Sequence, residues 1–235
     1  DFYTDEKFGK VPKGWLVKSV RECFDFFPTA SYSRSMLIDK GNIMYIHYGD
    51  IHTKFDRILD LGNQTLPCIP EGLKKKFELL EDGDLVVSDA SEDWEGVGKC
   101  IEIINVENKQ IIAGLHTLHL RPKSDDFIQG IKGYIFNIHQ VAINIKRLAT
   151  GIKVYGISKP NLGRVLLPVP TSPEQNLIKE KLDFCSNDIS RKEAKIQILN
   201  RLKKSLMQHL LTGKVRLPQG VIDRMLKEEK EVVNA

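Results

Sequence analysis

Ser172-Pro173-Glu174-Gln175 begins the stretch that decides the fold, and Leu210-Leu211-Thr212-Gly213-Lys214 ends it. The stretch predicts one uninterrupted helix of about 40 residues, roughly 60 Å long at about 1.5 Å per residue. Ser172 can cap this helix, Pro173 suits its first position, and Gln175 stands where a capping-box partner is expected. Gly213 tolerates the left-handed conformation that often follows a last helical turn. A helix of this length is expected to act as a spacer or a dimerisation arm.

The apolar residues of this helix recur at intervals of three and four residues, and once of seven, as in a coiled-coil seam. Lys192 and Lys203 fall on the same seam, where a polar residue lowers stability but can fix the register. A helix lying along its own globular domain is the alternative, and it would leave much of the helix in water. The predicted dimerisation seam consists of Ile178, Leu182, Cys185, Ile189, Ile196, Leu199, Leu206 and Leu210.

Residues 1–170 predict a strand-rich globular domain of the α+β class, because strand patterns alternate with a few helical ones. Two long loops, 48–66 and 89–98, are expected to be functional, since long ordered loops in compact domains usually are. After the globular domain the chain divides into the long helix, 171–213, and a C-terminal tail, 214–235. Helix is also expected over 135–148, and strands over Ile43–His47, Asp84–Ser88, Lys99–Ile104, Gly114–Leu120, 153–157 and 164–167.

Charge is unevenly distributed although the formal net charge is only +4. Residues 127–173 contain no Asp or Glu, and neither do residues 201–216, whereas acids gather in 78–107 and 228–231. The helix dipole explains part of the second basic segment. Basic segments without acids in a nearly neutral chain suggest a surface that binds a polyanion. For the segment 127–173 we favour nucleic-acid binding over a charged surface that is merely solvated.

Motifs for catalysis and metal binding are missing from the sequence. It contains no GxxxxGK[ST], GxGxxG, GxSxG or HExxH, and no methyltransferase [DNS]PP[YFW] signature. His116 and His119 would point to opposite faces of a strand, so they are expected to be partly buried and not a metal pair. The acids from Asp84 to Asp93 lack a nuclease-type lysine pattern and favour an acidic turn between strands.

The cysteines predict no metal site, because they are scattered without a CxxC pair. Free thiols favour a reducing cytoplasm as the compartment. No apolar run approaches the ~18 residues that a membrane span needs. The cysteines are Cys23, Cys68, Cys100 and Cys185.

Several short motifs, weak singly but specific in their order and spacing, resemble the specificity subunits of type I restriction-modification systems (the HsdS family). The resemblance runs almost from end to end of the chain. The motifs are Gly9-Lys10-Val11-Pro12-Lys13-Gly14-Trp15, Tyr45-Ile46-His47-Tyr48-Gly49-Asp50-Ile51, Gly83-Asp84-Leu85-Val86-Val87-Ser88, Asn161 to Pro170 leading into Glu174-Gln175, and Leu210 to Leu217.

The resemblance implies a target recognition domain that reads one half of a bipartite DNA site, followed by a long helix that pairs antiparallel with its counterpart. Full subunits carry two such units, so this chain resembles either a half-sized subunit that forms a homodimer or one half of a longer protein. The implied partners are modification subunits, which hold S-adenosylmethionine, and restriction subunits. The chain itself is then a non-catalytic DNA-binding subunit with no cofactor of its own.

Polar side chains on the loops are the candidate base readers, and basic ones near residue 150 the candidate phosphate contacts. Acids beside Trp94 would repel phosphates, so that loop is expected to meet a cytosine amino group or the modification subunit. A competing interpretation is an assembly module whose helix docks partners and which binds no DNA; an unrecognised nuclease or methyltransferase is another. The predicted DNA-binding residues are Tyr32, Ser33, Arg34, His52, Lys54, Arg57, Ser88, Ser91, Lys146, Arg147, Lys153, Tyr155 and Lys159.

Overall fold

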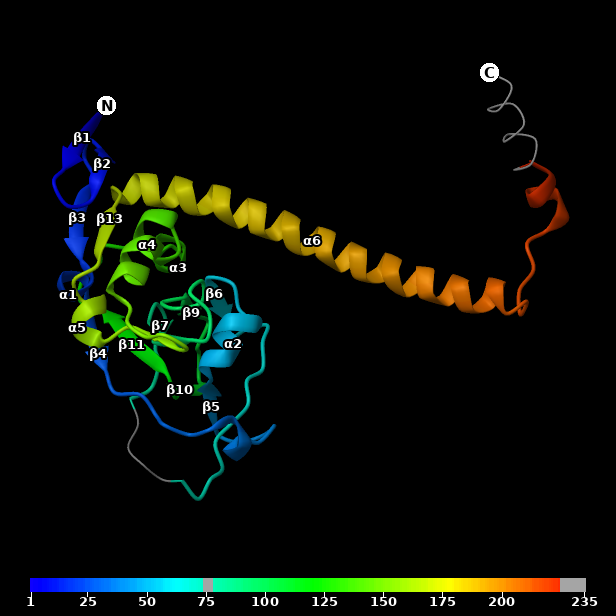
Figure 1. Cartoon of the computed structure of the whole chain (residues 1–235), viewed down its shortest axis with the longest axis horizontal. Coiled ribbons are helices and arrows are strands. Elements are labelled where there is room, and N and C mark those ends of the chain that lie inside the picture. Colours follow the sequence, from blue (N-terminus) through cyan, green and yellow to red (C-terminus); the bar gives the residue numbers. More distant parts are fainter. Residues whose placement is uncertain (74–77, 225–235) are drawn as a thin grey trace. The chain divides into compact units, whose positions relative to one another are not determined.

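The computed structural model describes residues 1–73 and 78–224 of the chain. Contacts divide the chain into two units, Asp1–Lys179 and Glu180–Ala235. Residues 225–235, which end the predicted C-terminal tail and include the acids of 228–231, lie outside the described residues. The first unit mixes strands and short helices, and one long helix follows, so the α+β class predicted from the sequence is confirmed (Figure 1).

Short strands and short helices make up the first unit, and α6 (Ser172–Leu211) begins in it. The helices are α1 (Val20–Cys23), α2 (Tyr48–Thr53), α3 (Lys132–Phe136), α4 (His139–Leu148) and α5 (Lys159–Leu162), with a 3₁₀ turn, η1, at Arg34–Met36. The strands are β1 (Phe2–Asp5), β2 (Gly9–Pro12), β3 (Leu16–Ser19), β4 (Phe24–Phe27), β5 (Ile43–Ile46), β6 (Ile58–Asp60), β7 (Leu85–Ser88), β8 (Ala90–Ser91), β9 (Cys100–Ile104), β10 (Gln110–Ala113), β11 (Thr117–Pro122), β12 (Tyr155–Gly156) and β13 (Leu166–Val169).

A five-stranded mixed sheet in the order β4-β11-β7-β9-β6 forms the centre of the first unit. β7 in its middle is buried on both faces, which explains its continuous apolar run Leu85–Val87, whereas the buried Glu102 interrupts the run in β9. Leu85 and Val87 of β7 pack into one core cluster, whereas Val86 between them packs into a second cluster on the other face. The smaller pairs β5-β10, β3-β13, β1-β2 and β8-β12 surround this sheet.

A buried ion pair fixes α3 to the sheet. Glu102 of β9 is fully buried, and Lys132 of α3 lies 2.6 Å from its carboxylate. The same carboxylate accepts hydrogen bonds from the backbone N–H groups of Gly130 and Gly133. A buried charge is tolerated only when it is paired and hydrogen-bonded, and here every partner comes from the segment around α3. A Cβ at Gly133 would meet the Arg57 carbonyl oxygen at 2.0 Å, so this close approach needs glycine.

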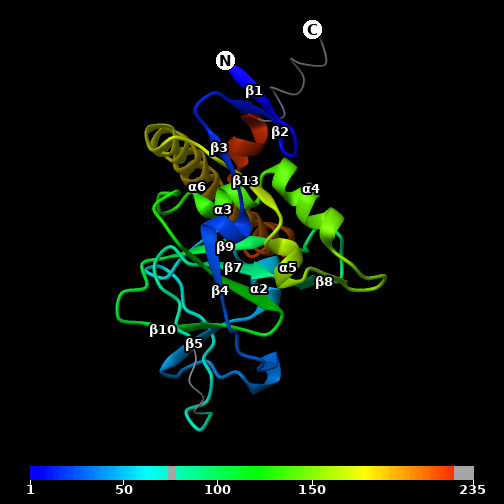
Figure 2. The same ribbon diagram turned by 90° about the vertical axis from the view of Figure 1, so that its left-hand side faces the viewer.

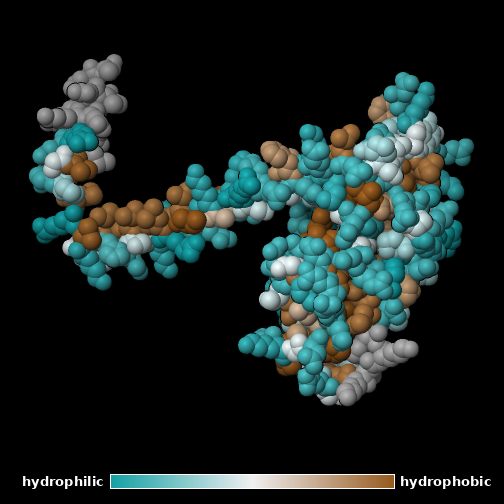
Figure 3. All heavy atoms as spheres, turned by 180° about the vertical axis from the view of Figure 1, so that it is seen from behind, coloured by the Kyte–Doolittle hydropathy of each residue, from teal (hydrophilic) through white to brown (hydrophobic). Residues whose placement is uncertain are grey.

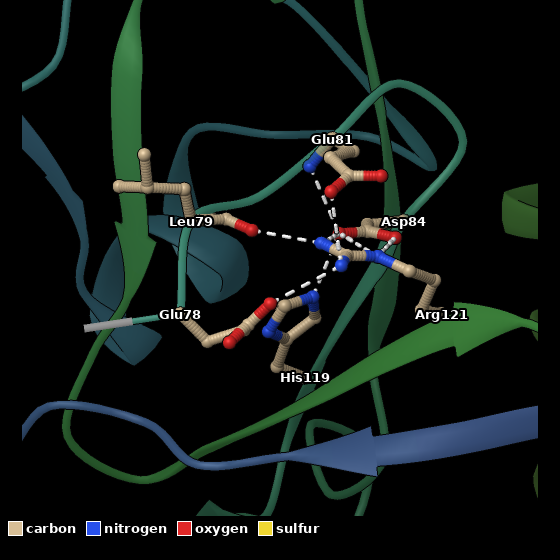
Figure 4. Close-up of polar contacts among 6 residues, drawn as sticks. All are labelled: Glu78, Leu79, Glu81, Asp84, His119 and Arg121. Atoms are coloured by element: carbon tan, nitrogen blue, oxygen red, sulfur yellow. Dashed lines mark hydrogen bonds and ion pairs between the residues drawn. The ribbon is translucent and has the colours of Figure 1, made fainter. Parts of the chain in front are cut away.

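A second polar network lies at the start of β7 (Figure 4). The buried Asp84 carboxylate lies 2.7 Å from Nε2 of His119, and it accepts hydrogen bonds from Nε and Nη2 of Arg121. Glu78 and Glu81 also pair with Arg121, and both are more exposed. Burial alone would raise the pKa of Asp84, but the hydrogen bonds from His119 and Arg121 hold it below its ordinary value. Asp84 is therefore part of this core network and not of the predicted acidic turn.

The first turn of α6 is attached to the globular part by polar contacts. Thr171 occupies the N-cap position, since it directly precedes the helix and its carbonyl oxygen accepts the Gln175 N–H. Its hydroxyl donates to the Glu174 carboxylate at 2.6 Å, and that carboxylate also accepts the indole N–H of Trp15. Gln175 is buried; its amide donates to the carbonyls of Asp126 and Pro170 and accepts from Ile128 N–H. The predicted roles of Ser172 as cap and of Gln175 as capping-box partner are thus wrong. The cap lies one residue earlier, and Gln175 joins the helix to the loop before α3.

Other elements differ locally from the sequence predictions. The helix expected over 135–148 is two helices, because Ile138 is extended and the Asn137 side chain donates to the carbonyls of Gly133 and Cys100. The expected loop 48–66 contains α2 and β6, and the expected loop 89–98 contains β8. The strand expected over 153–157 shortens to Tyr155–Gly156. No helix among residues 1–73 and 78–224 is long and apolar enough to cross a membrane.

His119 lies on strand β11, as predicted, and is fully buried where partial burial was expected, but His116 is not on a strand. His116 precedes β11 with a φ of 56° and has a half-exposed side chain. The expectation of two strand histidines is therefore right for His119 and wrong for His116.

The second unit consists mainly of the rest of α6, whose apolar residues are exposed. Ile178, in the first unit, packs against the globular core, whereas Ile189, Ile196, Leu199 and Leu206 are each about half exposed. Leu182 and Leu210 are partly buried, and Cys185 is exposed. Figure 3 shows hydrophobic side chains in a row along the C-terminal half of the helix. Gly213 follows with a φ of +70°, as the predicted stop signal requires.

Asp84→Asn is expected to destabilise the protein by about 3–5 kcal/mol at neutral pH, because it leaves Arg121 without its buried counter-charge. The lowered pKa of Asp84 means that its contribution is present above the carboxyl's ordinary pKa and is lost as pH falls through the lowered value. The difference in melting temperature between wild type and variant should therefore become smaller below about pH 4. Glu81→Gln is the control and should change little, since Glu81 is largely exposed. An Asp84→Asn protein as stable as wild type at neutral pH would contradict this role.

Candidate nucleic-acid interface

The N-terminus of α2 and the 3₁₀ turn η1 together position a group of charged side chains. Nδ1 of His47 accepts the Gly49 N–H and so caps α2. Asp50 in the first turn is buried, and both Arg34 and Lys54 lie 2.8 Å from its carboxylate. Burial would raise the pKa of Asp50, but the two cations outweigh it and lower the pKa. One anchored carboxylate thus holds two half-exposed cations, Arg34 and Lys54, side by side.

The other face of α2 is joined to β7 and β8. Nε2 of His52 lies 3.0 Å from the Ser88 hydroxyl and 3.2 Å from the Ala90 carbonyl oxygen. Ser88 and Ser91 are both buried, and Ser91 bonds to Asp93. The structure therefore places the predicted base readers His52, Ser88 and Ser91 together, but it places the two serines inside the fold, where they support α2.

Rings of tyrosine and histidine gather beside this helix. The Tyr48 ring centroid lies 4.7 Å from that of His47, 5.9 Å from that of His52 and 5.4 Å from that of His116. Nδ1 of His116 lies 3.5 Å from Asp89, whose pKa is raised by burial although His116 opposes this effect. Neither Tyr48 nor His116 was among the predicted DNA-binding residues; His116 joins this group from just before β11, where its φ is 56°.

The three remaining loop candidates lie in different surroundings. Tyr32 is buried with its ring against Tyr45, so it is not at the surface. Ser33 is exposed and bonds to Ser35. Arg57 pairs with Asp56 and lies over the Tyr134 ring. Among the loop candidates, Arg34, His52 and Lys54 are thus the ones that the structure gathers around α2 with their side chains at least partly accessible.

The candidate phosphate contacts lie on α4, on the loop after it, on β12 and on α5. Lys146 is mostly buried and paired with Glu95, whereas Arg147 and Lys153 are exposed. Tyr155 stacks edge-on against Trp94 with 4.9 Å between the ring centroids. Lys159, at the start of α5, reaches the Phe27 carbonyl oxygen.

A basic groove of about 710 Å³ lies between α1, α4 and the segment before β13. Within the described part of the chain none of its four cations forms an ion pair, and its one acid, Glu22, has its carboxylate held by the backbone N–H and hydroxyl of Ser19. Those contacts lower the pKa of Glu22. Unpaired cations around a groove suit a chain of phosphates, which binds mainly through charge. The four cations are Lys7, Arg21, Arg147 and Arg164.

The chain is similar in sequence and in fold to specificity subunits of type I restriction enzymes. No protein-family model matches the chain. The type I restriction enzyme EcoKI specificity subunit of Escherichia coli K12 is 23% identical over 214 residues, covering 88% of this chain and 44% of that protein. The putative MjaX specificity subunit of Methanocaldococcus jannaschii is 25% identical over 243 residues, covering 98% and 53%. The crystal structure of the HsdS subunit from Thermoanaerobacter tengcongensis superposes with a TM-score of 0.54 at 20% identity, covering 88% of this chain and 47% of that one.

The chain thus has the fold of known type I specificity subunits. Its sequence is similar to those of the specificity subunits of type I restriction enzymes, and it spans about half the length of the curated relatives that it matches.

Replacing Arg147 and Arg164 together by Ala should weaken binding to every DNA sequence by a similar factor and reduce the slope of log affinity against log salt by about 1 for each lost phosphate contact. The measurement is fluorescence anisotropy with labelled duplexes over a range of salt. Lys181→Ala with Lys195→Ala removes the same charge from exposed positions of α6 and is the control. An unchanged slope in the groove variant, or an equal change in the control, would contradict the assignment.

Proposed function

We propose that this chain is a sequence-specific DNA-recognition subunit of a type I restriction-modification enzyme and reads one half of a bipartite site. The supporting observation is that its similarity to specificity subunits covers 88% to 98% of the chain, and so includes both the globular part and the long helix. A mixed domain with a basic groove, followed by a helix with an exposed apolar seam, suits a reader that is held at a fixed distance from a second reader.

In this proposal one set of side chains in the globular part supplies affinity for DNA, and another set recognises its sequence. Exposed cations, above all Arg147 and Arg164 of the groove and Lys153, contact phosphates and set the position on the duplex. Side chains around α2 then reach base edges in the major groove. Arg34 and Lys54 suit the acceptors of guanine, and the Tyr48 hydroxyl can donate or accept. Asp50 keeps the two cations in place before DNA arrives.

The long helix is proposed to pair antiparallel with the same helix of a second copy, or with a second such helix of a longer subunit. Two recognition domains related by a twofold axis would read an interrupted palindrome, because the symmetry of a dimeric reader is copied into its site. Helix length would then set the spacer between the half-sites.

The proposed partners are double-stranded DNA, modification subunits and restriction subunits, all meeting in the cytoplasm. S-adenosylmethionine would bind the modification subunit, so catalysis would belong to the partners and not to this chain. An assembly module that docks partners through α6 without binding DNA is the competing function, and the exposed apolar residues of α6 favour docking in both cases.

Selecting sites from a random DNA pool, with the chain assembled on its modification subunits, tests the proposal. The expected result is an interrupted palindrome, and removing two heptads from α6 should shorten the spacer without changing the half-site bases. The control keeps the helix length and carries Lys181→Ala and Lys195→Ala. An undivided site, or a spacer indifferent to helix length, would refute the proposed role of the helix. No enrichment at all would favour the assembly module.

A further inference from the structure

The loop between α4 and β12 is closed and braced by its own backbone. Thr150 and Gly156 exchange two backbone hydrogen bonds of 2.8 Å. Gly151 has a φ of +135°, and a Cβ there would meet the Val154 carbonyl oxygen at 1.9 Å, so the turn requires glycine. A loop closed in this way holds its tip in one conformation.

The base of this loop is fixed to the element that supports α2. Tyr155 and Gly156 of β12 pair with Ser91 and Ala90 of β8, and Tyr155 packs against Trp94. The Ala90 carbonyl oxygen in turn contacts His52 of α2. Figure 2 shows the yellow-green loop after α4 projecting beyond the rest of the globular part on the side where β8 lies. The tip therefore stands out beside the surface proposed to read bases.

Apolar side chains occupy the tip. Ile152 is 93% exposed and Val154 is 54% exposed, while Trp94 at the base of the loop is 41% exposed. A single exposed aliphatic residue is ordinary on a protein surface. Here two of them stand on a braced, projecting loop, where they gain nothing for the fold of the free chain. Such a tip is suited to burial in a partner.

The charge around the tip identifies the partner. Lys153 lies between the two apolar residues, and the whole of 127–173 lacks acids. Of the acids beside Trp94, Glu95 is paired with Lys146 and Asp93 accepts the Gly96 N–H, while Glu92 is exposed. An apolar point within a basic segment matches a molecule with anionic edges and an apolar interior, which is the arrangement of phosphates and stacked bases in duplex DNA.

We propose, resting on the proposed function, that Ile152 is a wedge that enters the minor groove and partly unstacks a base step beside the half-site, while Lys153 contacts the adjacent phosphate. Aliphatic wedges of this kind kink DNA towards the major groove and allow it to wrap more of the protein surface. The wedge would make flexible pyrimidine–purine steps preferred at a position where no side chain reads a base edge.

The test uses the chain assembled on its modification subunits and a duplex carrying the selected site, with 2-aminopurine placed in turn at each flanking position. Wild type should raise the 2-aminopurine fluorescence at one base step. Energy transfer between dyes at the two ends of the duplex should show that the DNA bends. Ile152→Ala should abolish both signals and weaken specific binding about tenfold, since most of the buried aliphatic group is removed. Ile152→Lys, which adds a cation but no wedge, should also lose the unstacking signal.

Leu177→Ala is the matched control, because Leu177 is an exposed aliphatic residue on α6, and it should behave as wild type. Site-specific binding by wild type without unstacking, or with unstacking that Ile152→Ala retains, would overturn the wedge while leaving the proposed function intact. Weaker assembly with the modification subunit, with DNA unstacking unchanged, would assign the tip to that partner instead and also overturn it. If wild type itself bound no DNA site specifically, the proposed function would have failed.

Discussion

An amphipathic helix of forty residues with a half-exposed apolar seam is the constraint on which the functional account depends. Exposed isoleucine and leucine at three- and four-residue spacing are costly to leave in water, and a second helix is the usual solution. Cys185 and the seam residues from Ile189 to Leu206 are exposed, whereas Ile178 packs on the globular core. The dimerisation seam proposed for this helix therefore begins after Ile178.

The globular unit shows how a scaffold can hold functional loops in place. A sheet buried on both faces accepts charged groups only when they are fully paired, as Glu102 is with Lys132 and Asp84 with Arg121 and His119. Those pairs join β7 and β9 to their surroundings, and β7 and β8 in turn support α2 through Ser88 and Ala90. The candidate contacts with DNA are thus carried on short elements whose positions depend on the core beneath them.

Local signals made the long helix and the central strands predictable. The helix start and stop, the seam spacing and the runs at β7 and β9 are properties of neighbouring residues, and the structure places these elements within a residue or two of the prediction. The six-residue α2 escaped prediction because it is too short for a helical period to show. The break before α4 depends on Asn137 reaching the distant Cys100 carbonyl. Gln175 likewise contacts Asp126 and Ile128 far along the chain, which no local pattern reveals.

The candidate site was predicted less well than the fold, for the same reason. The basic groove draws Lys7, Arg21, Arg147 and Arg164 from four separate segments, and only Arg147 was among the predicted contacts. Tyr32, Ser88 and Ser91 have the right chemistry for base reading, but tertiary packing buries them. Whether a loop residue is buried depends on which distant segments cover it, and the residues beside it in the sequence do not reveal this.

The central claim is that α6 pairs antiparallel with a second copy, and pulsed electron–electron double resonance tests it most directly. A nitroxide at Asn176→Cys in a Cys185→Ser background labels one site, since Cys23, Cys68 and Cys100 are buried. If two copies cross near Lys192, the two labels should lie about 50 Å apart at about 1.5 Å per residue, and Leu199→Glu should abolish the dipolar signal by yielding monomers. A label distance under about 20 Å would mean parallel helices, and no dipolar signal from the unmutated seam would mean that the helix does not pair; either result would contradict the account.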